Sequence, residues 1–261
     1  MIIREESDII FIEQHEHALI SGQFINKWRE NLFTGLEWKP SVEYAVSNHD
    51  RSWIPLDRKF MYLPEKDSLA SFIDFPLKKK IEAYEAGIEQ LLKEDPYAGY
   101  LISCHYASFF KDKEDPLSAK FINHERIRQD KILKRIFKQE KKFTREIRDF
   151  HFDLLQFCDN LSLYLCMNRW GAKKNEEVTW FKDGFTQQLA TLDKKRVYAN
   201  WESETTISLN PFPFEKERVH VSIPYKRLTK QETRSDNIRQ IYRDAPYESH
   251  PVVIVNAKQM A

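Results

Sequence analysis

The sequence predicts a mainly α-helical domain with a short β-hairpin before it and an antiparallel β segment after it, an α+β fold overall. From about residue 14 to residue 171, apolar residues recur in steps of three and four, which is typical of amphipathic helices. Outside that region, short runs rich in Ile, Val and Thr alternate with polar residues, which is typical of strands. We expect residues 1–171 to form one helical unit and residues 172–261 to pack on it rather than fold independently.

Composition limits the classes of function. A chain of 261 residues is long enough to bury a sizeable core without disulfides. Its 41 basic and 40 acidic side chains leave a formal charge of +1, which disfavours a nucleic-acid binder with a large basic surface. None of the six glycines is spaced as in a Gly-rich nucleotide loop. We therefore expect no nucleic-acid partner, while the oligomeric state stays open.

The cysteines and the N-terminus indicate the compartment. Cys104, Cys158 and Cys166 lie in apolar, helical stretches without a C-x-x-C pair, as buried free thiols do in a reducing environment. The chain turns acidic at residues 5–6, where a secretory signal would carry its apolar core, and it has no run of 18 apolar residues. We expect a cytoplasmic protein that has no membrane partner.

The N-terminal hairpin is predicted from two apolar pieces, residues 2–4 and 8–13, separated by Glu-Glu-Ser-Asp. From Gln14 the spacing becomes that of a helix that runs to about Asn31. Another helix is expected over residues 41–49, because Ser41 can cap it and Val42, Ala45 and Val46 form an apolar stripe.

Residues 53–76 contain three prolines and no sustained periodicity, so we expect an ordered loop there. Four helices are then predicted, over residues 77–93, 97–110, 117–139 and 143–169. Five strands follow, over residues 178–181, 196–201, 206–209, 219–223 and 252–255. We expect Pro211, Pro213 and Pro224 to interrupt the strands, since proline donates no ladder hydrogen bond.

Four polar side chains contributed by three separate predicted helices are candidate metal ligands: His17, His49, Asp50 and Asp159. Imidazole nitrogens and carboxylate oxygens together suit a divalent ion such as Mn, Fe, Mg or Zn. Asp159 has apolar neighbours that would bury its helix, and an unpaired buried carboxylate costs several kcal/mol. A metal ion would partner this carboxylate, and a salt bridge or hydrogen bond is the alternative.

Three short stretches resemble a known superfamily. They are Gln14-His15-Glu16-His17, Asn48-His49-Asp50 and Cys158-Asp159-Asn160-Leu161-Ser162. A histidine on an early helix, a His-Asp pair at the end of a later one and an aspartate on a late helix resemble the HD superfamily of metal-dependent phosphohydrolases. The resemblance implies an HD-like helical fold in which His17, His49, Asp50 and Asp159 hold the metal.

A narrower resemblance covers most of the chain. The opening Met1-Ile2-Ile3-Arg4, residues 14–23 and residues 48–53 resemble an uncharacterised bacterial family of unknown function. That family brings no established activity.

The HD resemblance leaves the number of ions and one ligand open. His15 is an alternative to His17, and we favour His17 because the small residues Ser21 and Gly22, one turn later, leave room for an ion. His105 lies where two-metal members place extra histidines, so the site would hold one or two ions. A hydrogen-bonded core histidine is the alternative for His105.

The resemblance implies a metal-dependent hydrolase that cleaves a phosphoester in a small phosphorylated substrate. The nucleophile would be a metal-bound hydroxide. Asp50 would be a ligand and would also position the attacking water. Arg51 stands where many members have Gly-Lys, so Arg51 and His105 are candidates for stabilising the developing charge. Two other functions stay open, an HD-type di-iron oxygenase and a non-catalytic interaction protein stabilised by metal.

Overall fold

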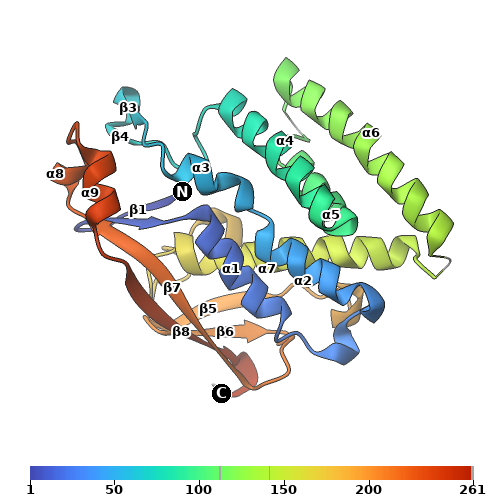
Figure 1. Ribbon diagram of the computed structural model, residues 1–261. Helices are drawn as coiled ribbons and strands as arrows, with labels where there is room; N and C mark the ends of the chain where they lie inside the picture. Colours follow the sequence, from blue (N-terminus) through green and yellow to red (C-terminus); the bar gives the residue numbers. More distant parts are fainter. Residues whose placement is uncertain (112, 141, 260–261) are drawn as a thin grey trace.

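The computed structural model describes residues 1–111, 113–140 and 142–259. A group of helices covers one side of a six-stranded sheet (Figure 1). This arrangement confirms an α+β fold with an N-terminal strand pair and a C-terminal sheet. Among the described helices, none combines the length and the apolar character needed to cross a bilayer.

The helices follow the predicted spacing most closely in the middle of the chain. The α-helices are α1 (Gln14–Ile25), α2 (Lys39–Asn48), α3 (Ile54–Asp57), α4 (Leu77–Glu94), α5 (Pro96–Ser108), α6 (Pro116–Gln139), α7 (Arg145–Met167), α8 (Lys230–Thr233) and α9 (Ile238–Asp244). Short 3-10 helices span Glu30–Leu32, Leu36–Trp38, Arg51–Trp53, Pro64–Lys66, Thr179–Phe181, Ala190–Leu192 and Ala257–Gln259. The four helices predicted between residues 77 and 169 are confirmed as α4 to α7.

The first two predicted helices have different ends in the structure. α1 stops at Ile25 rather than near Asn31, because the chain turns there and the backbone N–H of Arg29 donates to the carbonyl of Pro213. α2 starts at Lys39, so Ser41 lies inside the helix and does not cap it. The expected loop over residues 53–76 also contains regular structure, namely α3 and a small hairpin.

The strands are β1 (Ile2–Glu5), β2 (Ile9–Ile12), β3 (Tyr62–Leu63), β4 (Ser68–Leu69), β5 (Tyr198–Ser203), β6 (Thr206–Asn210), β7 (Arg218–Leu228) and β8 (Glu248–Asn256). β3 and β4 pair with each other, and the other six form one sheet in the order β1-β2-β7-β8-β6-β5. The N-terminal hairpin and the C-terminal segment therefore share a sheet.

Two expectations for the C-terminal segment are wrong. Its strands are not all antiparallel, because β6 and β8 pair in parallel. Pro224 does not interrupt a strand but lies inside β7, where it pairs with Ser249 of β8. On its other side, β7 pairs with β2 only from Lys226 to Leu228, so proline removes no ladder bond to β2.

The prediction of a strand over residues 178–181 is also wrong, since Thr179–Phe181 is a 3-10 helix. The apolar residues in this segment do not alternate as in a strand; instead, one of them anchors the segment in the core. Phe181 is buried and packs edge-to-face on Tyr164, with the ring centroids 5.7 Å apart.

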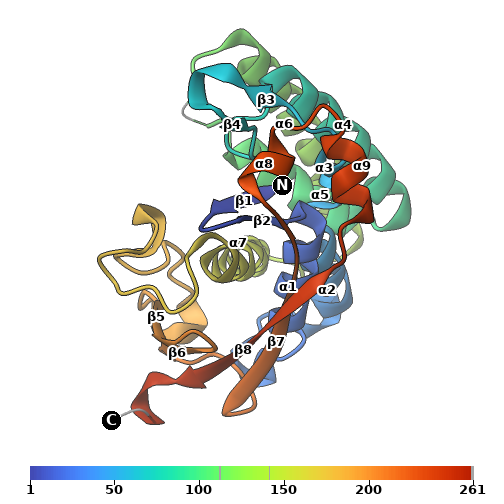
Figure 2. The same ribbon diagram turned by 90° about the vertical axis from the view of Figure 1, so that its left-hand side faces the viewer.

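The helix α7 lies at the centre of the molecule and is buried over most of its length. Figure 2 looks along its axis, with the β5–β8 strands on one side and α4, α5 and α6 on the other. α1, α2 and α5 all pack against α7. Polar side chains on the inner faces of these four helices therefore meet in the core.

Candidate metal centre

Five buried ionisable side chains meet where α1, α2, α5 and α7 pack together. His17 lies on α1, His49 and Asp50 directly follow α2, His105 lies on α5 and Asp159 lies on α7. All five are buried. Buried charges in a protein core are paired or bind metal, so this cluster requires an explanation in terms of its contacts.

The distances within the cluster are short. Nε2 of His17 lies 2.9 Å from Oδ2 of Asp50 and 3.9 Å from Oδ1 of Asp159. Nε2 of His49 lies 3.2 Å from the same Oδ1, and Nε2 of His105 lies 3.6 Å from Oδ2 of Asp159. Ligands at about 2.1 Å from a tetrahedral ion are about 3.4 Å apart, so these separations suit a shared cation.

Two overlapping sets of side chains have this geometry. One consists of His17, His49 and Asp50, and the other consists of His49, His105 and Asp159. Within each set, the ligand atoms all lie within 4.8 Å of one another. His49 belongs to both sets, so the cluster offers one composite site or two adjacent ones.

Hydrogen bonds orient the two imidazoles that face the carboxylates. Nδ1–H of His49 donates to the carbonyl of Val46 at 2.8 Å, which leaves the lone pair on Nε2. Ser162 donates to the carbonyl of Asp159, so it accepts from Nδ1–H of His17 at 2.7 Å. Both histidines thus direct an Nε2 lone pair at a carboxylate oxygen, an arrangement that needs a proton or a cation between the atoms.

Several of these atoms lack hydrogen-bond partners within the described chain. They are Nε2 of His49, Oδ1 of Asp50 and both ring nitrogens of His105. A buried polar atom without a partner costs about 1–3 kcal/mol, so four such atoms in one cluster are unusual. The donor set and the unpartnered atoms together fit a divalent ion.

Burial and the carboxylates set the protonation of the cluster. Burial alone lowers the pKa of His49, but contact with Asp159 outweighs it and raises this pKa to about 9. Burial alone raises the pKa of Asp159, but contact with His49 lowers it to about 2. For His105, farther from Asp159, burial lowers the pKa to about 4. Without an ion, His49 and Asp159 form a buried ion pair, and His105 is neutral.

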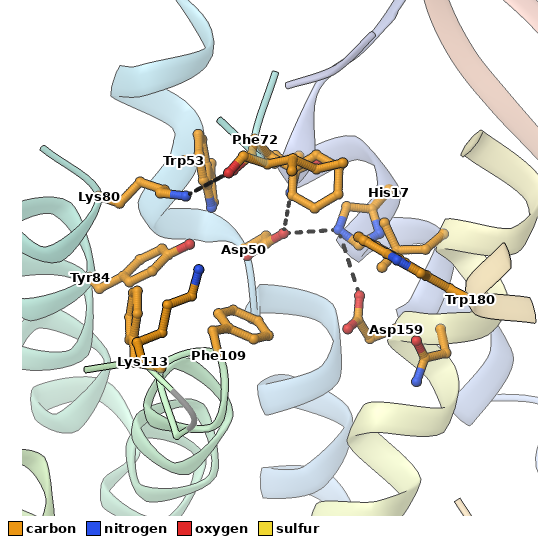
Figure 3. Close-up of a pocket in the computed structure, with 15 residues that line it drawn as sticks. His17, Asp50, Trp53, Phe72, Lys80, Tyr84, Phe109, Lys113, Asp159 and Trp180 are labelled. Carbon is orange, nitrogen blue, oxygen red and sulfur yellow. Dashed lines mark hydrogen bonds and ion pairs between the residues drawn. The ribbon is translucent and has the colours of Figure 1, made fainter. Parts of the chain in front are cut away.

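A cavity of about 350 Å³ opens onto the cluster, as Figure 3 shows. His17, Asp50 and Asp159 line it, whereas His49 and His105 are not among its lining residues. Its other lining residues are Gln14, Trp53, Phe72, Ile73, Lys80, Tyr84, Phe109, Phe110, Lys113, Asn160, Leu163 and Trp180. A volume near 300 Å³ is at the lower end for small-molecule sites, so the cavity fits a small ligand.

The family model for "Protein of unknown function (DUF3891)" matches residues 1–230. The chain belongs to this family. The matched region contains all five residues of the cluster and every lining residue of the cavity. Searches of curated proteins and of solved structures find no match. None of these comparisons supports the resemblance to the HD superfamily.

In this DUF3891 member, the structure brings together the four predicted ligands and His105, but not His15. His15 belongs to neither candidate ligand set. Burial lowers the pKa of His15, and its Nδ1 has no hydrogen-bond partner among the described residues.

The expectation that Ser21 and Gly22 leave room for an ion beside His17 is wrong, although His17 does lie in the cluster. Gly22 does not leave room for an ion, because a Cβ atom there would lie 2.3 Å from Oγ of Ser47 on α2. Ser21 is also occupied, since its hydroxyl lies 2.8 Å from that of Ser162. These small residues instead let α1 approach its neighbours closely.

Arg51, predicted to stabilise developing charge, is not among the residues that line the cavity. Its guanidinium pairs with Glu94 at 2.8 Å and donates to Tyr44 at 3.0 Å. The structure places two other cations, Lys80 and Lys113, in the lining. Sequence reasoning missed both, because each lies in a charged stretch that is indistinguishable from a solvated surface.

Lys80 and Gln14 are held in place by their own contacts. The ammonium of Lys80 donates to the carbonyls of Phe72 and Ile73, at 3.1 and 3.2 Å. Burial and the neighbouring Lys113 lower the pKa of Lys80. Gln14 donates from Nε2 to Oδ2 of Asp50 at 2.9 Å and so orients a candidate ligand.

Proposed function

We propose that this protein is a metal-dependent hydrolase that acts on small phosphoesters. One observation carries the proposal, namely that a single cavity combines a candidate cation site with two ammonium groups. Figure 3 shows Lys80 and Lys113 on the opposite side of Asp50 from His17 and Asp159. A phosphoester bound there would meet positive charge on both sides.

The ion would be held by His17, His49, Asp50 and Asp159, with His105 available to a second ion. Nitrogen and carboxylate ligands accept Zn, Mn or Fe, and the two carboxylates also accept Mg. When bound, the ion would lower the pKa of a coordinated water and so supply a nucleophile near neutral pH.

The protein's own side chains would bind the phosphate and move the proton. Lys113, which has no ion-pair partner in the described part of the chain, would bind non-bridging phosphate oxygens together with Lys80. Oδ1 of Asp50 has no hydrogen-bond donor among the described groups, so it can accept the proton of the attacking water. Water adds to phosphorus, the ester P–O bond breaks, and the departing oxygen takes up a proton.

Elemental analysis of the purified protein tests the metal site. We expect one or two divalent ions per chain in the wild type and a loss of most metal in His49→Ala and Asp159→Asn. Asp149→Asn, an exposed change on the same helix, serves as the matched control and keeps its metal. Equal metal in all four proteins would show that the ligand assignment is wrong.

A phosphoester screen then tests the reaction. Turnover of simple phosphoesters by the wild type, and its loss with the metal, would support a hydrolase. Two irons per chain with oxygen-dependent activity would favour the oxygenase. Bound metal without turnover in either assay would favour a non-catalytic site.

A further inference from the structure

Large apolar side chains gather at the mouth of the cavity although they are exposed. Ile73, Phe109 and Trp180 have exposed fractions of 53%, 42% and 51%, and all three line the cavity. They come from separate segments, the loop before α4, the end of α5 and the 3-10 helix Thr179–Phe181. Exposed apolar groups that converge on one cavity indicate a surface that a ligand covers.

The position of Trp180 follows from its neighbour. Phe181 is buried and anchors the 3-10 helix, so the adjacent Trp180 points outward. Its ring meets Phe72 edge-to-face, with the centroids 6.4 Å apart. Trp180 lines the same cavity as His17 and Asp159 (Figure 3), so its ring forms an apolar wall of the cavity that contains the candidate cation site.

Phe109 forms a second wall. Its ring contacts His105 edge-to-face at 4.6 Å between centroids, and it also faces Tyr84 at 6.3 Å. The apolar walls therefore begin directly beside the ionisable cluster. A ligand whose phosphate sits on the cluster would place its organic group against these rings.

The lining offers few groups that could recognise a sugar or a nucleobase. Besides Tyr84, its neutral polar side chains are two amides, Gln14 and Asn160. The amide nitrogens of both are already engaged, because Nε2 of Gln14 donates to Asp50 and Nδ2 of Asn160 donates to Gln187 at 3.0 Å. Oε1 of Gln14 has no hydrogen-bond partner among the described residues, so the two amides leave one clearly available acceptor. Hydroxyl groups placed against the apolar walls would lose hydrogen bonds to water without replacing them.

We infer that the substrate is a phosphomonoester of an apolar alcohol, whose hydrocarbon group packs on Ile73, Phe109 and Trp180. This inference rests on the proposed function. The ammonium groups of Lys80 and Lys113 match the two negative charges of a monoester, and the small cavity accommodates one modest organic group.

Binding of hydrolysis-resistant phosphonates tests the inference by calorimetry on the metal-loaded full chain. Benzylphosphonate should bind at least about tenfold more tightly than methylphosphonate, because its ring buries apolar surface. Trp180→Ala and, separately, Ile73→Ser should reduce this preference to about threefold or less. Phe137→Ala, which removes an exposed aromatic ring outside the cavity, should leave the preference unchanged.

Equal affinity for the two phosphonates would overturn the inference, as would a preference that survives both cavity substitutions in proteins with unchanged melting temperature. Comparing the hydrolysis of phenyl phosphate with that of glycerol 2-phosphate tests this inference separately from the proposed hydrolase function. If both esters are hydrolysed equally well, the hydrolase stands and the inference fails. If benzylphosphonate is preferred but neither ester is hydrolysed, the apolar walls bind as inferred and the hydrolase fails.

Discussion

Nε2 of His49 lies 3.2 Å from Oδ1 of Asp159, although the two residues belong to different helices far apart in the chain. Both are buried, and the nitrogen has no hydrogen bond of good geometry within the described chain. A buried ion pair gains little net stability, because desolvation offsets the attraction. A cation between the two groups would explain why the core keeps them.

Metal binding should therefore stabilise the folded protein. An ion at a hundred times its dissociation constant adds about 2.7 kcal/mol, which raises the melting temperature by several degrees. Differential scanning fluorimetry, with chelator and then with added Mn²⁺ or Zn²⁺, measures this shift. The shift should disappear in Asp159→Asn and persist in Asp149→Asn, and an equal shift in both would contradict the site.

Lys113 should contribute to substrate binding and not to metal binding. Replacing its ammonium in Lys113→Gln removes one charge from the phosphate environment, so we expect kcat/KM to fall about tenfold or more. Metal content should stay at the wild-type level. The matched control is Lys111→Gln, since Lys111 is exposed and outside the cavity lining. Equal kinetic effects of the two substitutions would argue against a role for Lys113.

His151 should make stability depend on pH independently of the candidate metal centre. Its Nε2–H donates to the carbonyl of Thr34 at 2.8 Å, and its Nδ1 accepts from the hydroxyl of Tyr97 at 2.7 Å. Burial lowers the pKa of His151 to about 4, so the unfolded chain binds the proton more tightly. The contribution of neutral His151 to the free energy of unfolding is therefore complete above about pH 6.5 and is lost as the pH falls towards 4. The total loss is at most about 3 kcal/mol.

Urea unfolding at pH 7.5 and pH 5 compares the wild type with His151→Gln, which does not titrate. The wild type's advantage in free energy of unfolding should be smaller at pH 5. A difference between the two proteins that is the same at both pH values would show that His151 is not responsible.

The sequence predicts local structure well and tertiary pairing poorly. α4 to α7 follow from local apolar patterns because most of the apolar side chains of these helices pack into the core. The parallel pairing of β6 with β8 depends on contacts between distant segments, which no local pattern encodes. Some residues of the candidate site can likewise be recognised in the sequence, and others only in the fold. His49 and Asp50 stand out as adjacent residue types suited to metal, whereas Lys80 and Lys113 become distinctive only when the fold places them in one cavity.

Gly22 should control the spacing of the helices that carry His17 and His49. A Cβ atom at this position would lie 2.3 Å from Oγ and 3.0 Å from Cβ of Ser47, so in Gly22→Ala the Ser47 hydroxyl must rotate away and α1 must shift from α2 by a few tenths of an ångström. Overpacking of this kind costs about 1–3 kcal/mol. We expect a lower melting temperature and weaker metal binding, because the displacement separates the two imidazoles.

The double variant Gly22→Ala with Ser47→Gly removes the opposing side chain. It should recover most of the lost metal affinity, even though glycine inside α2 itself costs about 1 kcal/mol of stability. Metal titration of the single and double variants measures this recovery. If Gly22→Ala lowers stability but leaves metal affinity unchanged, the close approach of α1 and α2 serves packing alone, and the ligand geometry does not depend on it.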